Sequence, residues 1–229
     1  MQEHTVKAFD EDITRLRGLI AEMGGLAEVA VAEAMDALVR SDEKLAADVV
    51  ARDKRLDALE MDVDKLAIRI IALRAPMADD LREIIAAMKI AGVLERVGDY
   101  AKNIAKRVGR IEGRKKFEPL TLIPAMGDIA REMVHDVMTA YAARDPKGAA
   151  EILVRDDKVD NFYNSIFRNL VTYMMEYPAA ISSAAQLMFV ARNLERIGDH
   201  ATNVAEMVHY AATGHYLPER EERGEAGRD

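Results

Sequence analysis

Two acidic stretches, a hundred residues apart, hold the side chains with the clearest capacity for chemistry. Each contains a Glu, an Asp four residues later and an Asn four residues after that: Glu95, Asp99 and Asn103, then Glu195, Asp199 and Asn203. Residues four apart on an α-helix lie on one face, about 5–6 Å from each other. Carboxylate and amide oxygens are the ligands that hard cations such as magnesium, manganese, iron and calcium prefer. We therefore predict that each stretch binds a divalent or trivalent hard metal ion.

The ordinary explanation for a single Glu-x-x-x-Asp pair is a solvated helix surface with a nearby Arg or Lys as partner. Repetition argues against it here, because Lys102 in the first stretch becomes Thr202 in the second while Glu, Asp and Asn persist. Gly98 and Gly198 also repeat, although a glycine inside a helix costs about 1 kcal/mol relative to alanine. The repeated glycine indicates close approach of a neighbouring helix or a ligand. Ancestral duplication without retained function is the alternative that the spacing leaves open.

Further acidic residues repeat on the helices that precede these stretches. Asp57 and Asp160 occupy matching positions and are predicted as additional metal ligands, if each helix packs in antiparallel fashion against the next. Asp53 and Asp156 also match, but lie one turn earlier. The alternative role for either pair is a negative charge near a helix N-terminus, where the helix dipole favours it.

The elements that position these residues are long amphipathic helices. Apolar residues recur every three or four positions, as in Leu56, Leu59 and Val63, and this period is typical of a helix with one buried stripe. Prolines separate such segments, because proline is disfavoured inside a helix but accepted in its first turn. The predicted helices cover residues 6–40, 43–74, 77–112, 120–143, 146–176 and 179–213.

The six predicted helices form two copies of a set of three. The strongest match aligns residues 94–105 with residues 194–205, and 8 of these 12 positions are identical. The sequence therefore predicts an all-α fold of two tandem, pseudo-symmetric, antiparallel three-helix bundles. We expect the first bundle in residues 1–112, a linker in 113–123, the second bundle in 124–215, and a charged, disordered tail in 216–229.

Composition excludes several classes of function. The chain has no cysteine, so thiolate nucleophiles and cysteine-bound metals are excluded, and its net charge of −8 makes nucleic acid an unfavourable partner. Neither a membrane-spanning apolar stretch nor a secretory signal occurs, so we expect a cytoplasmic protein. Phosphate-binding glycine loops and nucleophile motifs are missing, and Gly98 and Gly198 stand where a di-iron enzyme needs histidine. We expect no enzyme activity.

The motifs Leu-Glu-Arg-Val-Gly-Asp and Leu-Glu-Arg-Ile-Gly-Asp resemble the paired Glu(Asp)-x-x-x-Asp motifs of the PhoU family of phosphate-uptake regulators. The resemblance covers residues 8–212 and assigns the family motif to Glu95, Asp99, Glu195 and Asp199. It implies two three-helix bundles, a multinuclear metal site on each, and homodimers. It also implies a cytosolic signalling adaptor that connects the ATPase subunit of the high-affinity phosphate ABC transporter to a sensor histidine kinase, with at most peripheral membrane association. Such an adaptor is a negative regulator that keeps the phosphate-starvation response off.

A second interpretation of the same residues needs no metal. In it, the chain is a helical scaffold whose acidic faces dock a basic helix of a partner protein. Bound metal, or a metal-dependent rise in thermal stability, separates the two interpretations.

Overall fold

The computed structural model describes residues 2–111 and 121–217, and this part of the chain is helical. The six α-helices are α1 (Gln2–Arg40), α2 (Glu43–Arg74), α3 (Asp79–Ala105), α4 (Leu122–Ala143), α5 (Pro146–Glu176) and α6 (Ile181–Thr213). Two single turns of 3-10 helix, η1 (Val108–Arg110) and η4 (Pro178–Ala180), accompany them. No β-strand occurs in these two ranges, and the predicted all-α fold is confirmed.

Helices α2 and α5 begin and end where the sequence predicts, and a side chain caps the first turn of each. Asp42 Oδ1 accepts a hydrogen bond from the Leu45 backbone N–H at 2.9 Å, and Asp145 Oδ1 accepts one from Lys147 N–H at 3.0 Å. Such caps satisfy backbone donors that have no partner inside the helix.

Five other predicted boundaries differ from the structure. Helix α1 starts at Gln2 instead of residue 6, α3 at Asp79 instead of residue 77, and α4 at Leu122 instead of residue 120. Helix α6 starts at Ile181 instead of residue 179 because η4 precedes it. Helix α3 ends at Ala105 instead of residue 112, since the next turns switch to hydrogen bonds between residues three apart, as from Arg107 N–H to Ile104 C=O at 3.0 Å.

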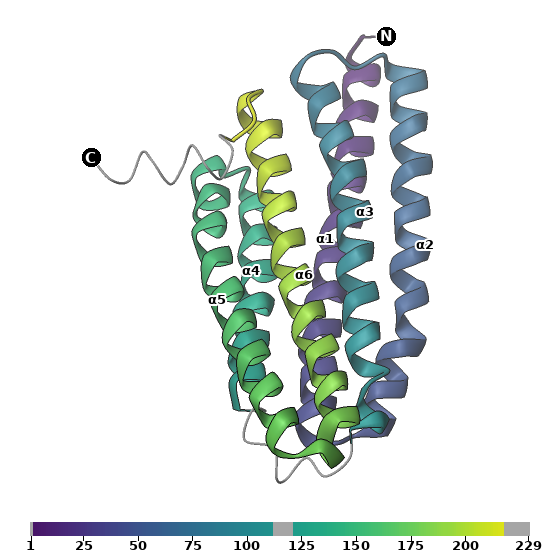
Figure 1. The fold of residues 1–229 in the computed structure, drawn as a ribbon. Coiled ribbons are helices and arrows are strands. Elements are labelled where there is room, and N and C mark those ends of the chain that lie inside the picture. The colour runs from purple at the N-terminus through teal and green to yellow at the C-terminus, as the bar shows by residue number, and fades with distance from the viewer. Residues whose placement is uncertain (1, 112–120, 218–229) are drawn as a thin grey trace, which may run out of the picture.

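The helices form two bundles of three, as predicted (Figure 1). Helices α1, α2 and α3 pack against one another and are called the first bundle, and α4, α5 and α6 form the second bundle. Contacts of α3 with α6 and of α1 with α4 join the two. Most of the predicted linker 113–123 and of the predicted disordered tail 216–229 lies outside the described residues.

One continuous apolar core runs through both bundles. Buried side chains from every helix belong to it, including Leu16 of α1, Leu94 of α3 and Leu194 of α6. Helices α3 and α6, which carry the two acidic stretches, lie side by side in the middle of the molecule (Figure 1). Both acidic stretches therefore lie on helices that contribute buried side chains to this core.

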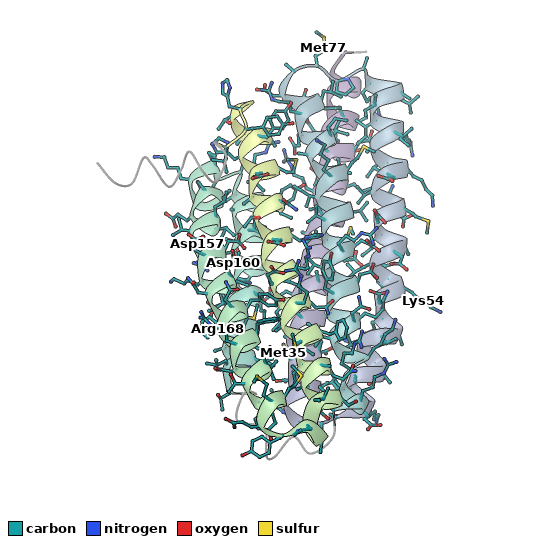
Figure 2. The ribbon with its side chains drawn as sticks, in the orientation of Figure 1. Met35, Lys54, Met77, Asp157, Asp160 and Arg168 are labelled. Atoms are coloured by element: carbon teal, nitrogen blue, oxygen red, sulfur yellow. The ribbon has the colours of Figure 1, made fainter. Side chains whose placement is uncertain are left out.

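Some large apolar side chains stay exposed where helices of one bundle join. Leu73 and Met77 lie at the α2–α3 joint, where Met77 projects from the end of the molecule (Figure 2). Met175 and Tyr177 occupy the matching α5–α6 joint. In the described part of the chain, no helix combines the length and apolarity needed to cross a membrane.

Replacing two glycines with alanine tests how closely α2 packs on α3. Gly18→Ala is expected to raise the free energy of unfolding by about 0.5–1 kcal/mol, because its new Cβ would have no neighbour within 4 Å. At Gly98 the new Cβ would overlap Cδ1 of the buried Leu56, so Gly98→Ala should not raise the free energy of unfolding. Urea unfolding measures both. Equal gains at the two positions would contradict the packing described here.

Candidate metal centre

The first acidic face consists of Glu95, Asp99 and Asn103 on α3, and it lies along α2. Asp53 of α2 is 8% exposed, and its Oδ1 lies 3.5 Å from where a Cβ of Gly98 would stand. The same Cβ would overlap Leu56 Cδ1, so the glycine allows the close packing of α2 on α3 that brings this buried acid beside the face. Asp57, the predicted ligand one turn on, is exposed. Its role in metal binding stays a prediction.

A lysine connects the acids of the two helices. Lys102 Nζ donates a hydrogen bond to Asp99 Oδ1 at 2.5 Å and another to Asp53 Oδ2. Arg96 donates to the other oxygen of Asp99 at 3.2 Å. Burial raises the pKa of Asp99, but the hydrogen bond and charge of Lys102 outweigh burial and hold that pKa below its ordinary value. For Lys102, burial lowers the pKa, but the two carboxylates raise it above the ordinary value. The first acidic face thus already contains a cation.

Glu95, one turn before Asp99, is in the opposite situation. Burial and then the charges of Asp99 and Glu60 raise its pKa to about 7, although Arg96 opposes them. Glu60 belongs to α2, and its Oε1 lies 3.3 Å from where a Cβ of Gly92 would stand. The sequence analysis misses Glu60. The signal that could have found it is its position two turns after Asp53, on the side of α2 that faces α3.

Neutralising Glu95 should stabilise the metal-free protein at high pH only. The folded state raises the Glu95 pKa from 4.5 to about 7, so the folded chain holds this proton more tightly than the unfolded chain does. The charged carboxylate is therefore a cost that develops between pH 4.5 and 7 and is fully present above pH 7. We expect Glu95→Gln to raise the unfolding free energy at pH 8 and to change it little at pH 4.

Urea unfolding of chelator-treated protein at both pH values measures this effect, with exposed Glu151→Gln as the control substitution. A gain for Glu95→Gln of the same size at pH 4 and pH 8 would show that charge is not the cause.

The second acidic face consists of Glu195, Asp199 and Asn203 on α6, and it repeats most of this geometry along α5. Asp156 is 7% exposed, and its Oδ1 lies 3.3 Å from where a Cβ of Gly198 would stand. Arg196 donates to Asp199 at 3.2 Å, as Arg96 does to Asp99. The buried acid of the neighbouring helix and the arginine beside the aspartate are therefore common to both faces.

Glu195 is held by one of its two carboxylate oxygens. Arg192 Nη1 donates to Oε1 at 2.5 Å, while Oε2 is buried and has no hydrogen-bond partner among the described residues. Burial raises the Glu195 pKa, the charges of Asp199 and Asp160 raise it further, and Arg192 and Arg196 oppose them. Asp160, a predicted ligand on α5, thus acts on Glu195 through its charge.

The two faces differ at the position of the lysine. Thr202 replaces Lys102, and its hydroxyl donates to the Asp199 backbone carbonyl at 2.6 Å. An open groove of about 900 Å³ runs beside it between α5 and α6. Its polar lining includes Asp156, Asp199 and Asn203. Position 202 therefore supplies no positive charge, and the carboxylates of Asp156 and Asp199 border the groove.

The contact between α3 and α6 brings together one pair of residues at matching positions of the two repeats. Tyr100 and His200 follow Asp99 and Asp199 directly, and their rings meet edge to face with centroids 5.2 Å apart. Burial lowers the His200 pKa. This pair links the two acidic helices across the bundle boundary.

The donors of the second face fit a hard cation by their chemistry. Two carboxylates and an amide lie on one helix face, a buried acid stands opposite, and Glu195 Oε2 is a buried acceptor without a hydrogen bond in the described structure. Within residues 2–111 and 121–217, no three His, Asp or Glu side chains are already arranged to hold an ion. The carboxylates would have to turn toward a common point. Metal binding at both faces stays a prediction.

Comparison with known proteins assigns the family. A family model described as the PhoU domain matches residues 20–108 and 123–208, once in each bundle. The phosphate-specific transport system accessory protein PhoU homolog of Zymomonas mobilis is 57% identical over 217 residues, which cover 95% of this chain and 92% of that protein. The homolog of Caulobacter vibrioides is 47% identical over 218 residues, 95% of each chain.

Solved structures agree with these sequence relatives. The crystal structure of PhoU from Pseudomonas aeruginosa superposes with a TM-score of 0.87 at 37% identity and covers 90% of this chain and 100% of that one. A phosphate transport system regulatory protein PhoU from Streptococcus pneumoniae gives a TM-score of 0.86 at 25% identity, over 92% of this chain and 100% of that one. With its domain matched twice and the whole fold shared, the chain belongs to the PhoU family.

Proposed function

We propose that this protein is a metal-binding, non-enzymatic regulator of phosphate uptake that acts in the cytoplasm and keeps the phosphate-starvation response off. The observation that carries the proposal is the duplicated acidic face, on adjacent helices, in a chain of the PhoU family. Its relatives in Zymomonas and Caulobacter are named accessory proteins of the phosphate-specific transport system, which supports the link to phosphate.

The proposed role is that of an adaptor. One partner is the ATPase subunit of the phosphate ABC transporter, and the other is a sensor histidine kinase. We further propose that the protein works as a homodimer. A surface charge of one sign favours encounters with partners of opposite charge, and the net charge of −8 makes basic partner surfaces the favourable ones.

The metal would be held by oxygen ligands on the acidic faces. Glu195, Asp199 and Asn203 are its proposed ligands in the second bundle, with Asp156 and Asp160 on the facing helix. For the first bundle, the repeat in the sequence predicts Glu95, Asp99 and Asn103 at the corresponding positions, with Asp57 as a further ligand. The ion would supply positive charge and open coordination positions for an acidic partner residue or phosphate. The protein's part is to fix the carboxylates on rigid, well-packed helices.

Deletion of the gene tests the regulatory role. In phosphate-rich medium, a phosphate-starvation reporter should become constitutive in the deletion strain and be repressed again by a plasmid copy of the gene. A reporter that stays repressed in the deletion strain would refute regulation of this response and favour the scaffold alternative.

A metal-free scaffold that docks a basic helix is the second candidate, and the ion pairs favour it. Arg96, Arg196 and Lys102 already donate to the acidic faces, as the side chains of a basic partner helix would. A thermal melt of chelator-treated protein with and without Mn²⁺ separates the candidates. The metal proposal expects the midpoint to rise with Mn²⁺, because a ligand that binds the folded state stabilises it. The scaffold proposal predicts that Mn²⁺ leaves the midpoint unchanged.

A further inference from the structure

The two acidic faces differ at positions 102 and 202 in whether a lysine lies between the carboxylates of the two helices. In the first bundle, the Lys102 ammonium lies between carboxylates of two helices, 2.5 Å from Asp99 Oδ1 and in hydrogen-bond contact with Asp53. The Lys102 and Asp53 side chains are 20% and 7% exposed. The ammonium is therefore held in a partly enclosed position in which its charge compensates two acids.

Oxygen atoms from two helices surround the Lys102 ammonium, as they would surround a bound metal ion. A lysine ammonium is a compact point charge that can donate three hydrogen bonds. An ion entering this position would have to displace Lys102 from both carboxylates or stand beside a like charge. Either course weakens metal binding, because like charges repel most strongly where water is partly excluded.

The second face lacks this obstacle. Thr202 stands at the matching position, and its hydroxyl is engaged with the backbone carbonyl of Asp199. Asp156 is as buried as its counterpart Asp53, and an open groove of about 900 Å³ gives access to Asp156 and Asp199. Glu195 also keeps a buried oxygen, Oε2, that no described side chain or backbone group reaches with a hydrogen bond. Arg96 and Arg196 are matched, so they do not distinguish the faces. Arg192 has no counterpart in the first bundle, where Gly92 stands, but it donates to Glu195 Oε1 along its own helix and leaves Oε2 without a hydrogen bond.

We propose that the Lys102 ammonium takes the place of a metal ion in the first bundle, and that metal binding by this chain is confined to the second acidic face. This inference rests on the proposed function, since it presumes that the protein binds metal at all. It makes one residue of each repeat, at positions 102 and 202, the determinant of which bundle is loaded. The two repeats would then have different tasks: a fixed, permanently charged face and a face whose charge depends on metal.

Reciprocal exchange of the two residues tests the inference. Wild type, Lys102→Thr, Thr202→Lys and the double exchange are stripped with chelator, incubated with excess Mn²⁺, desalted, and analysed for manganese per chain by mass spectrometry. We expect Lys102→Thr to bind about twice as much as wild type, Thr202→Lys to bind less than a tenth as much, and the double exchange to return to the wild-type amount. Lys102→Arg, which keeps the charge, and exposed Lys89→Thr on the same helix should bind as wild type does.

Circular dichroism melts confirm that each variant is folded. Thr202→Lys keeps Lys102 in place, so it tests the inference even if Lys102→Thr fails to fold. Suppose that wild type binds manganese. If Thr202→Lys then binds the same amount, or if a folded Lys102→Thr protein binds no more than wild type, this inference is overturned while the proposed metal function stands. The absence of manganese from wild type and from every folded variant would overturn the proposed metal function as well.

Discussion

Glu195→Gln combined with Asp199→Asn is expected to weaken Mn²⁺ binding about a hundredfold or more. Each substitution keeps the shape of the side chain and removes a negative charge from the second acidic face. An interaction with a charged group contributes about 1.5–3 kcal/mol, and 1.4 kcal/mol corresponds to a factor of ten. The variant should remain folded, because amides preserve the hydrogen-bonding oxygen at both positions. Calorimetric titration of chelator-treated protein with Mn²⁺ measures the change in affinity.

The control is a second acidic pair with the same spacing. Asp128 and Glu132 also stand four residues apart, but they are exposed on α4. Asp128→Asn combined with Glu132→Gln removes the same charge from the chain and should leave Mn²⁺ binding as it is in wild type. Equal weakening by the two double variants would mean that the ion is attracted by net charge instead of being held by the second acidic face.

Leu194→Ala is expected to lower the free energy of unfolding by about 2–5 kcal/mol, which is the usual range for a buried leucine. Leu194 is fully buried on α6, directly before Glu195, in the core that both bundles share. The substitution leaves a cavity that the surrounding helices cannot close without moving. Because the two bundles share one core, urea unfolding should show a single transition at a lower midpoint.

Leu73→Ala provides the matched control, since the same atoms are removed from a side chain that is 65% exposed. Its unfolding free energy should stay within about 0.5 kcal/mol of wild type. Two separate transitions in Leu194→Ala, with the first bundle melting as in wild type, would contradict the shared core.

Most of the fold could be predicted from the sequence because its signals are local. Helices α2 and α5 begin where predicted since Asp42 and Asp145 cap their first turns, and the repeat predicts that the helices form two sets of three. The extent of α3 could not be predicted, because apolar residues continue at helical spacing to Ile111 while the backbone turns to 3-10 hydrogen bonds after Ala105. The spacing of apolar residues in the sequence hardly changes where α-helical hydrogen bonds give way to 3-10 hydrogen bonds.

The candidate site was predictable along each helix but not between helices. Glu95, Asp99 and their counterparts share a face by spacing alone. Which acid of α2 lies opposite depends on the rotation of that helix, and the structure brings Asp53 beside Gly98 while Asp57 is exposed. The repeated glycines gave the right indication of close helix packing. The position of Lys102 between two carboxylates required the three-dimensional arrangement, because its partner Asp53 is 49 residues away.

The most direct test of this account asks whether the metal-binding face carries the regulatory function. The chromosomal gene is replaced by one that encodes Glu195→Gln with Asp199→Asn, and a phosphate-starvation reporter is measured in phosphate-rich medium, with protein abundance checked by immunoblot. Wild type and the Asp128→Asn, Glu132→Gln strain serve as repressed references, and the deletion strain as the derepressed one. We predict reporter activity at the level of the deletion strain with the variant protein present at wild-type abundance. Full repression by a variant that has lost its metal when purified would contradict the account.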